Sequence, residues 1–151
     1  MIDTFRPLLD AARGVDLADP QAARAELVRR LDPRGPAAVA LNRALTDLLD
    51  ARRIADRGDP PVRWSRVAKA TPESLGFSID AVDMHGPGPH HVHPDGEVNW
   101  CVALEGDPRF DGQPAGWVVM PPGSGHVPTV SGGRMLIVYL LPGGKIEFTK
   151  A

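Results

Sequence analysis

The chain has 151 residues and a net charge of −2, and 42% of its residues are hydrophobic while 24% are charged. This length suits one domain, and the charge gives no bulk attraction to nucleic acid or to an anionic membrane. No apolar run reaches the roughly 18 residues that span a bilayer, no signal-peptide pattern is visible, and the single cysteine excludes an intrachain disulfide. We therefore expect a cytoplasmic protein that binds neither nucleic acid nor membrane.

The first 60 residues have the hydrophobic period of α-helices. Asp19 and Pro20 predict an N-cap followed by proline at the first helical position, where its missing N–H costs nothing. The arginine-rich run "ARRIADR" is balanced by acids, which favours a solvated face or helix–helix ion pairs over a nucleic-acid patch. The expected helices are a short one over residues 4–13, one that begins at Pro20, and one over residues 36–57.

After residue 60 the pattern changes to short runs of Val, Ile, Phe and Trp separated by Gly and Pro. Closely spaced strands of this kind are typical of an all-β sandwich or small barrel. We expect a mainly β domain over residues 61–151 with an α-helical extension over residues 1–60. Short amphipathic helices need a partner, so the extension should pack on the barrel or form the interface of a homodimer or higher homo-oligomer.

All five histidines lie in the β half, between positions 85 and 126. His91 and His93 are two apart, which puts them on the same face of a strand. The turn sequence "PDG" that follows can bring Glu97 opposite both imidazoles. His126 comes directly after a second Gly/Pro turn, "PPGSG", which can return a strand beside the first pair.

These four side chains offer three imidazoles and one carboxylate, without a thiolate. Such a set favours a divalent ion (Fe, Mn, Zn, Ni or Co) and leaves open the coordination positions that a catalytic metal needs. The alternative is that the histidines are ordinary surface residues. That alternative would require the whole pattern to be a coincidence, but it fits His85 and His90, which lack ligand-like spacing.

Two runs resemble the cupin motifs. "HVHPDGE" matches the core H-x-H-x(3)-E of the first motif, and "GWVVMPPGSGH" matches G-x(n)-P-x-G-x(2)-H of the second. The resemblance implies a cupin-type double-sheet (jelly-roll) barrel of six to eight strands over residues 62–148. It also implies metal ligation by His91, His93, Glu97 and His126. Cupins host many chemistries, so the motifs indicate a fold rather than a reaction.

A narrower resemblance is carried by the runs from Gly86 to Glu97 and from Gly116 to Gly144, after a helical N-terminus. This layout is similar to that of the 4-hydroxylaminobenzoate lyase family. The resemblance implies an enzyme that converts 4-hydroxylaminobenzoate and water to 3,4-dihydroxybenzoate (protocatechuate) and ammonia in bacterial nitroaromatic degradation. The alternatives are another metal-dependent cupin enzyme, a dioxygenase or isomerase acting on a small aromatic acid, and a non-catalytic ligand-binding cupin.

The hypothesis for the reaction is that the bound ion polarises the N–O bond of the substrate. The four metal ligands are then catalytic candidates, and His85 or His90 is the candidate acid or base.

Candidates for binding the substrate follow from position and charge. Strand alternation from Glu97 predicts that Asn99 and Cys101 face inward, with Asn99 hydrogen-bonded to substrate and Cys101 a small buried residue rather than a catalytic thiol. Tyr139 is expected to be a core residue with its hydroxyl satisfied, or else a donor in the pocket. The candidates for binding the aryl carboxylate are Arg109, Arg134 and Arg63.

Overall fold

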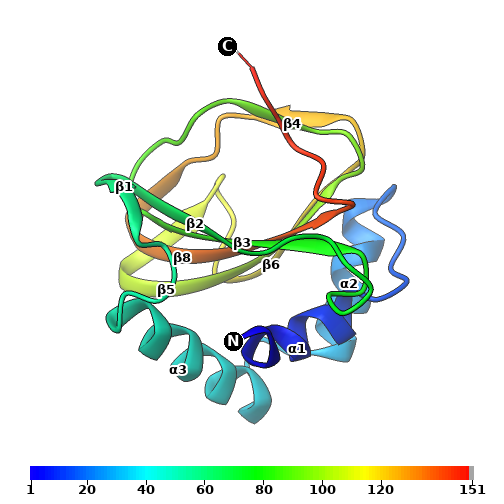
Figure 1. Cartoon of the computed structure of the whole chain (residues 1–151), viewed down its shortest axis with the longest axis horizontal. Helices are drawn as coiled ribbons and strands as arrows, with labels where there is room; N and C mark the ends of the chain where they lie inside the picture. Colours follow the sequence, from blue (N-terminus) through cyan, green and yellow to red (C-terminus); the bar gives the residue numbers. More distant parts are fainter. Residues whose placement is uncertain (150–151) are drawn as a thin grey trace.

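The computed structural model describes residues 1–149 and consists of two antiparallel sheets with three helices against one of them (Figure 1). The larger sheet has the strand order β1-β2-β3-β8-β5-β6, and the smaller has the order β7-β4-β9. The helices are α1 (Ile2–Ala12), α2 (Pro20–Arg30) and α3 (Pro36–Asp50), and the strands are β1 (Arg57–Asp59), β2 (Val62–Ala68), β3 (Phe77–Met84), β4 (His91–His93), β5 (Glu97–Phe110), β6 (Gly116–Met120), β7 (Ser124–His126), β8 (Val130–Pro142) and β9 (Glu147–Phe148).

The start of α2 is the one that the sequence predicts. The Asp19 carboxylate accepts a hydrogen bond from the Ala22 amide at 3.2 Å, and Pro20 occupies the first turn. The short first helix is also present, although it begins two residues earlier than expected. Among residues 1–149, none of the helices has the length and the apolar character that a membrane crossing requires.

Helix α3 ends at Asp50, seven residues before the expected end, because a capping turn stops it. Arg52 adopts a left-handed conformation with φ 58°, and its amide donates to Leu49 O while the Arg53 amide donates to Leu48 O. These are the hydrogen bonds of a Schellman motif, formed here with arginine where glycine is usual. The chain then buries Ile54 completely in the core.

The larger sheet begins before residue 61, since β1 pairs with β2. Its presence brings the number of strands within residues 1–149 to nine. The eight others lie within residues 62–148, where six to eight strands were expected. The other runs of Val, Ile, Phe and Trp form strands as predicted, and the run "FSIDAVDM" is the whole of β3. Residues 71–76, "TPESLG", form consecutive hydrogen-bonded turns between β2 and β3.

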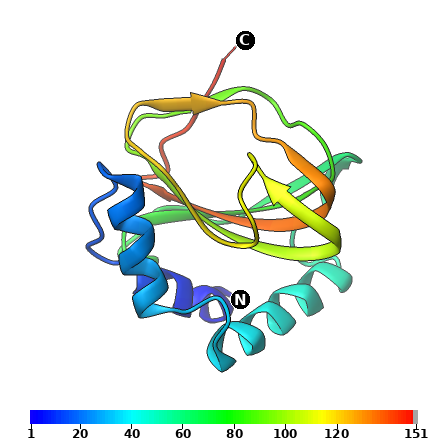
Figure 2. The same ribbon diagram turned by 180° about the vertical axis from the view of Figure 1, so that it is seen from behind.

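The two faces of the larger sheet belong to different hydrophobic cores. One face packs on the helices through residues such as Val98, Trp100 and Val102, and the opposite face, with Cys101 and Tyr139, lines the interior of the barrel. Figures 1 and 2 show the helices on one side of this sheet and the smaller sheet across from its other side. The predicted alternation along β5 is therefore confirmed, and the helical extension packs on the barrel. The expected homo-oligomer stays a prediction.

Gly96 is required by the turn that joins β4 to β5. Its φ is +87°, in the left-handed region, and a Cβ there would lie 2.9 Å from Met120 O and 3.0 Å from Leu17 Cδ1. The next residue is Glu97, the first of β5. The turn thus sets where the glutamate enters the barrel.

We expect Gly96→Ala to lower the free energy of unfolding by more than Gly14→Ala does. Gly14 also has a positive φ, +71°, but nothing lies within 4 Å of its added Cβ, so this control measures only the backbone cost of about 1–2 kcal/mol. Gly96→Ala adds a steric clash of about 1–3 kcal/mol. Urea denaturation of both variants measures the difference, and equal losses would contradict the close packing at Gly96.

Candidate metal centre

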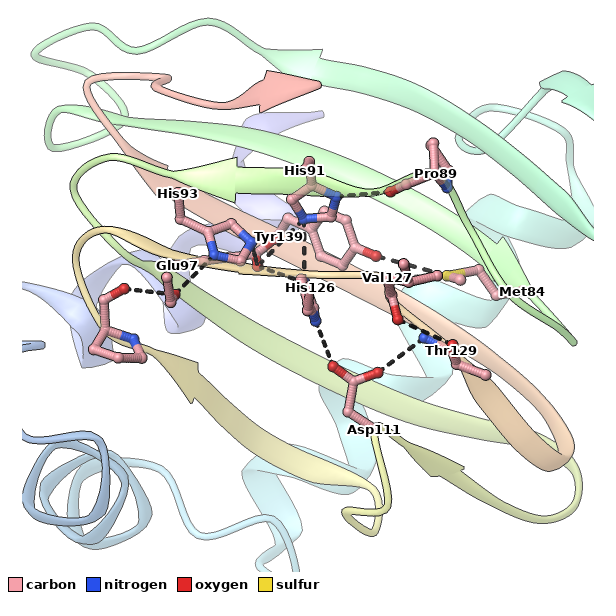
Figure 3. Close-up of polar contacts among 12 residues, drawn as sticks. Met84, Pro89, His91, His93, Glu97, Asp111, His126, Val127, Thr129 and Tyr139 are labelled. Carbon is pink, nitrogen blue, oxygen red and sulfur yellow. Dashed lines mark hydrogen bonds and ion pairs between the residues drawn. The ribbon is translucent and has the colours of Figure 1, made fainter. Parts of the chain in front are cut away.

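The four residues predicted as ligands converge inside the barrel (Figure 3). Antiparallel pairing of β4 with β7 puts His91 directly opposite His126. His93 lies on the same face of β4 as His91, and the Gly96 turn returns the chain so that Glu97 faces both. One ligand atom from each residue lies within 4.8 Å of all the others. This span is close to that of ligand atoms each about 2.0–2.2 Å from one ion.

The cluster is tight and shielded from solvent. His93 Nε2 lies 2.6 Å from Glu97 Oε2, while His91 Nε2 and His126 Nε2 each lie 3.9 Å from the same oxygen. His93 and Glu97 are completely buried, whereas the His126 side chain is 14% exposed. Among the four residues, His126 is therefore the one nearest solvent, and the glutamate lies at the buried end of the cluster.

Hydrogen bonds at the outer nitrogens fix how the imidazoles are protonated. His91 Nδ1 donates to Pro89 O at 3.2 Å, and His126 Nδ1 donates to the Asp111 carboxylate. His93 Nδ1 donates to Ser124 Oγ at 3.1 Å, because that hydroxyl gives its own hydrogen to Pro121 O at 2.6 Å. Each ring in its neutral form therefore has a bare Nε2 that faces the cluster, as in histidines that bind metal ions.

The inner atoms lack partners that would explain their burial. His93 Nε2 and both oxygens of Glu97 make no hydrogen bond among the described residues, since the close His93–Glu97 contact is not aligned as one. The Nε2 atoms of His91 and His126 lie 3.2 Å apart, a separation at which two lone pairs repel. A cation between them removes both problems. The donor set therefore fits a divalent ion.

The charge of Glu97 suits binding of a metal ion. Burial raises the pKa of its carboxyl, but the adjoining His91 and His93 imidazoles, when protonated, outweigh that effect and bring the pKa down to about 2. The group is therefore an anionic carboxylate at neutral pH, which is the form that binds a metal ion.

Two predicted substrate-binding residues lie on the inner face of the barrel. Asn99 is fully buried, and neither its amide nitrogen nor its amide oxygen has a hydrogen-bond partner among residues 1–149. Tyr139, its neighbour on β8, borders the same cavity as His91 and directs its hydroxyl to Met84 Sδ at 3.6 Å. Cys101 is a buried free thiol, as expected, and burial raises its pKa, so it stays protonated.

The structure does not bring the other candidates to the cluster. His85 is exposed and borders a separate hollow together with Arg63 and Arg134, because it follows the last residue of β3 and no longer shares its inner face. The Arg134 guanidinium pairs with both oxygens of Asp83. The remaining two candidates are an exposed Arg109, which borders neither cavity, and His90, whose Nδ1 contacts Thr149 Oγ1.

Sequence reasoning missed Asp111. Its carboxylate binds His126 Nδ1 through one oxygen and accepts the Thr129 amide through the other, at 2.9 Å (Figure 3). Asp111 lies in the "FDGQ" turn between β5 and β6, where a positive φ of 49° suits aspartate. An Asp-Gly pair in a hairpin turn normally indicates only the turn, so no local pattern indicated the contact with His126.

Two antiparallel sheets that enclose a three-histidine, one-glutamate cluster, with its residues drawn from the two motif runs, define this chain as a cupin. A sequence model of one family, described as PnbB, 4-hydroxylaminobenzoate lyase, matches residues 21–148. The chain belongs to that family.

Two curated relatives carry the same description as this family. The chain is 33% identical to a 4-hydroxylaminobenzoate lyase of Pseudomonas putida, over 59% of this chain and 60% of that protein. It is 36% identical to one of Nocardioides sp. (strain LMS-CY), over 59% and 57%. The match therefore spans about 60% of the length of these relatives.

The solved structures that it resembles are remote in sequence. An RmlC-like cupin protein of Ralstonia eutropha has 14% identity and a TM-score of 0.43, over 61% of this chain and 62% of the other. A cupin-like protein of Thermotoga maritima has 16% identity and a TM-score of 0.40, over 60% and 77%.

We expect Asp111→Asn to weaken binding of Co²⁺ or Zn²⁺ about 10- to 100-fold, because the amide holds the His126 ring and its tautomer less firmly than the carboxylate. Calorimetric titration of metal-free protein measures the affinity. The matched control is Asp107→Asn, at an exposed aspartate on the neighbouring strand, which should bind as the unmodified protein does. Equal affinities of the two variants would show that Asp111 does not support the site.

Proposed function

We propose that this protein is a 4-hydroxylaminobenzoate lyase, which converts 4-hydroxylaminobenzoate and water to 3,4-dihydroxybenzoate and ammonia. The observation that carries the proposal is the convergence of His91, His93, Glu97 and His126 beside an apolar cavity. Membership of the lyase family and the two named relatives support the choice of reaction. The proposed substrate is a small aromatic acid.

We propose that these four side chains hold a divalent ion, which is Fe, Mn, Zn, Ni or Co. Such an ion supplies Lewis acidity toward the hydroxylamino group. Nitrogen and oxygen ligands without a thiolate suit all five metals, so the donor set favours a borderline divalent ion over Cu(I).

The protein's own residues prepare the site around this centre. The three outer hydrogen bonds keep a proton on each Nδ1 and hold the rings in fixed orientations. Within residues 1–149, neither the amide donor nor the amide acceptor of Asn99 has a partner, and the residue lies on the inner face, two positions after Glu97. We assign it to hydrogen-bond the substrate or the reacting water. The largely apolar wall of the cavity at His91 leaves few polar groups to hold water beside a bound substrate.

The reaction balances without an external oxidant, because the nitrogen is reduced as the ring is oxidised. We therefore expect the metal-loaded protein to turn over in the absence of oxygen, with one ammonia and one 3,4-dihydroxybenzoate formed per substrate. Anaerobic assays of both products measure this. A requirement for oxygen would instead support a dioxygenase, and a tightly bound metal without turnover would support a non-catalytic ligand-binding cupin.

The second test concerns the metal itself. His91→Ala removes one of the four ligands, so the purified variant should lose its metal and at least about 100-fold in activity, since even loss of an outer-sphere partner costs about 10- to 100-fold. Elemental analysis and the same assay measure the two effects. His85→Ala is the matched control because His85 is exposed and outside the cluster, and it should keep both. An active, metal-free His91→Ala protein would overturn metal-assisted chemistry.

A further inference from the structure

A cavity of about 610 Å³ lies between the inner face of the larger sheet and the segment around β4, and His91 forms part of its wall. Met84 and Tyr139 line one side, and Pro89 and Phe148 line the other. Figure 3 shows the Tyr139 ring beside His91, with Met84 at the far end of the Tyr139 hydroxyl. A cavity with two apolar walls suits a flat ring, and its volume exceeds what one benzene ring needs.

The charged pair in this cavity is Arg66 on β2 and Asp80 on β3. The two residues are register partners, and Arg66 donates from Nε to Asp80 Oδ1 at 2.9 Å and from Nη2 to Oδ2 at 3.1 Å. This pairing fixes the plane of the guanidinium and leaves Nη1 and the second hydrogen of Nη2 without a partner among residues 1–149. The Arg66 side chain is 40% exposed, so an incoming ligand can reach these donors.

We infer that Arg66, oriented by Asp80, binds the carboxylate of an aromatic acid whose ring fills this cavity and whose opposite end faces His91. The inference rests on the proposed function, and it names the residue that recognises the acid group. A guanidinium presents paired N–H donors that match the two oxygens of a carboxylate. Because Asp80 balances the charge of Arg66, recognition depends on the direction of these donors rather than on net positive charge.

The position of Arg66 separates it from the arginines that the sequence suggested. Among the described residues, it is the arginine that borders the cavity at His91. Arg63 and Arg134 border the separate hollow at His85, and Arg109 borders neither. Strand alternation explains the difference, since Arg66 pairs with Asp80 and Trp64 pairs with Val82, which is an interior residue.

The test uses two unreactive probes, 4-hydroxybenzoate and its neutral counterpart 4-hydroxybenzamide, titrated calorimetrically into the metal-loaded protein. We expect the carboxylate to bind more tightly than the amide. Arg66→Met keeps an apolar stem but loses the donors, so it should weaken 4-hydroxybenzoate binding about 10- to 100-fold, as loss of a charge-assisted hydrogen bond does. Binding of 4-hydroxybenzamide should change less than about threefold.

Two further variants serve as controls, one for the position of the arginine and one for folding. Arg109→Met, at an exposed arginine outside the cavity, should bind both probes as the unmodified protein does. If Arg66→Met does not fold because Asp80 is left unpaired, Arg66→Lys retains a cation beside it, and the loss of paired donors should still lower the ratio of carboxylate to amide affinity. An unchanged ratio in the Arg66 variants, or no preference for the carboxylate in the unmodified protein, overturns the inference.

The binding experiment does not depend on turnover, so the two proposals fail separately. Arg66-dependent binding of 4-hydroxybenzoate in a protein that releases no ammonia would uphold the carboxylate site and refute the lyase reaction. Ammonia release, together with a ratio of 4-hydroxybenzoate to 4-hydroxybenzamide affinity that does not change in the Arg66 variants, would uphold the reaction and refute the carboxylate site.

Discussion

The antiparallel pairing of β4 with β7 is the interaction on which the rest of the site depends. It puts His91 opposite His126 and His93 opposite Ser124. The first pairing brings the Nε2 atoms of His91 and His126 together, and the second places the Ser124 hydroxyl where it accepts a hydrogen bond from the His93 ring. Each of these strands has three residues, so few hydrogen bonds define the register. A slip of one residue would turn the imidazoles to the opposite face. Further pairing of β4 with β9 supports the register from the other edge.

Strand β5 connects this centre to the helical layer. Side chains alternate along this strand. One face, with Glu97, Asn99 and Cys101, points into the barrel, and the other face, with Val98, Trp100 and Val102, packs on the helices. The indole of Trp100 donates to Asn42 on α3 at 2.8 Å. The helices therefore pack on the outer face of β5, the strand that begins with Glu97, the proposed carboxylate ligand. Holding this strand in place is a structural reason for a helical layer beside the barrel.

The sequence was informative where a pattern is local. The spacing of His91, His93 and Glu97 across a turn predicted their convergence, and Asp19 with Pro20 predicted a helix start. It was not informative where contacts join distant segments, as when Asp111 reaches His126, or where an unusual residue such as Arg52 caps a helix. The sequence offered several arginines without choosing among them for a related reason. Arg109 precedes Phe110 and Arg134 precedes Met135, and both of these neighbours are interior residues. Strand alternation therefore turns the two arginines away from the cavity, but the sequence alone did not show which face of each strand points inward.

The placement of the three tryptophans gives the molecule natural optical probes of two separate events. Trp100 and Trp117 meet edge to face, with ring centroids 4.8 Å apart, in the buried interface between helices and sheet. Trp64 is 48% exposed and borders the cavity at His91. Emission from the buried pair therefore reports detachment of the helices, while quenching of the exposed indole reports arrival of an aromatic guest, and no dye has to be attached for either.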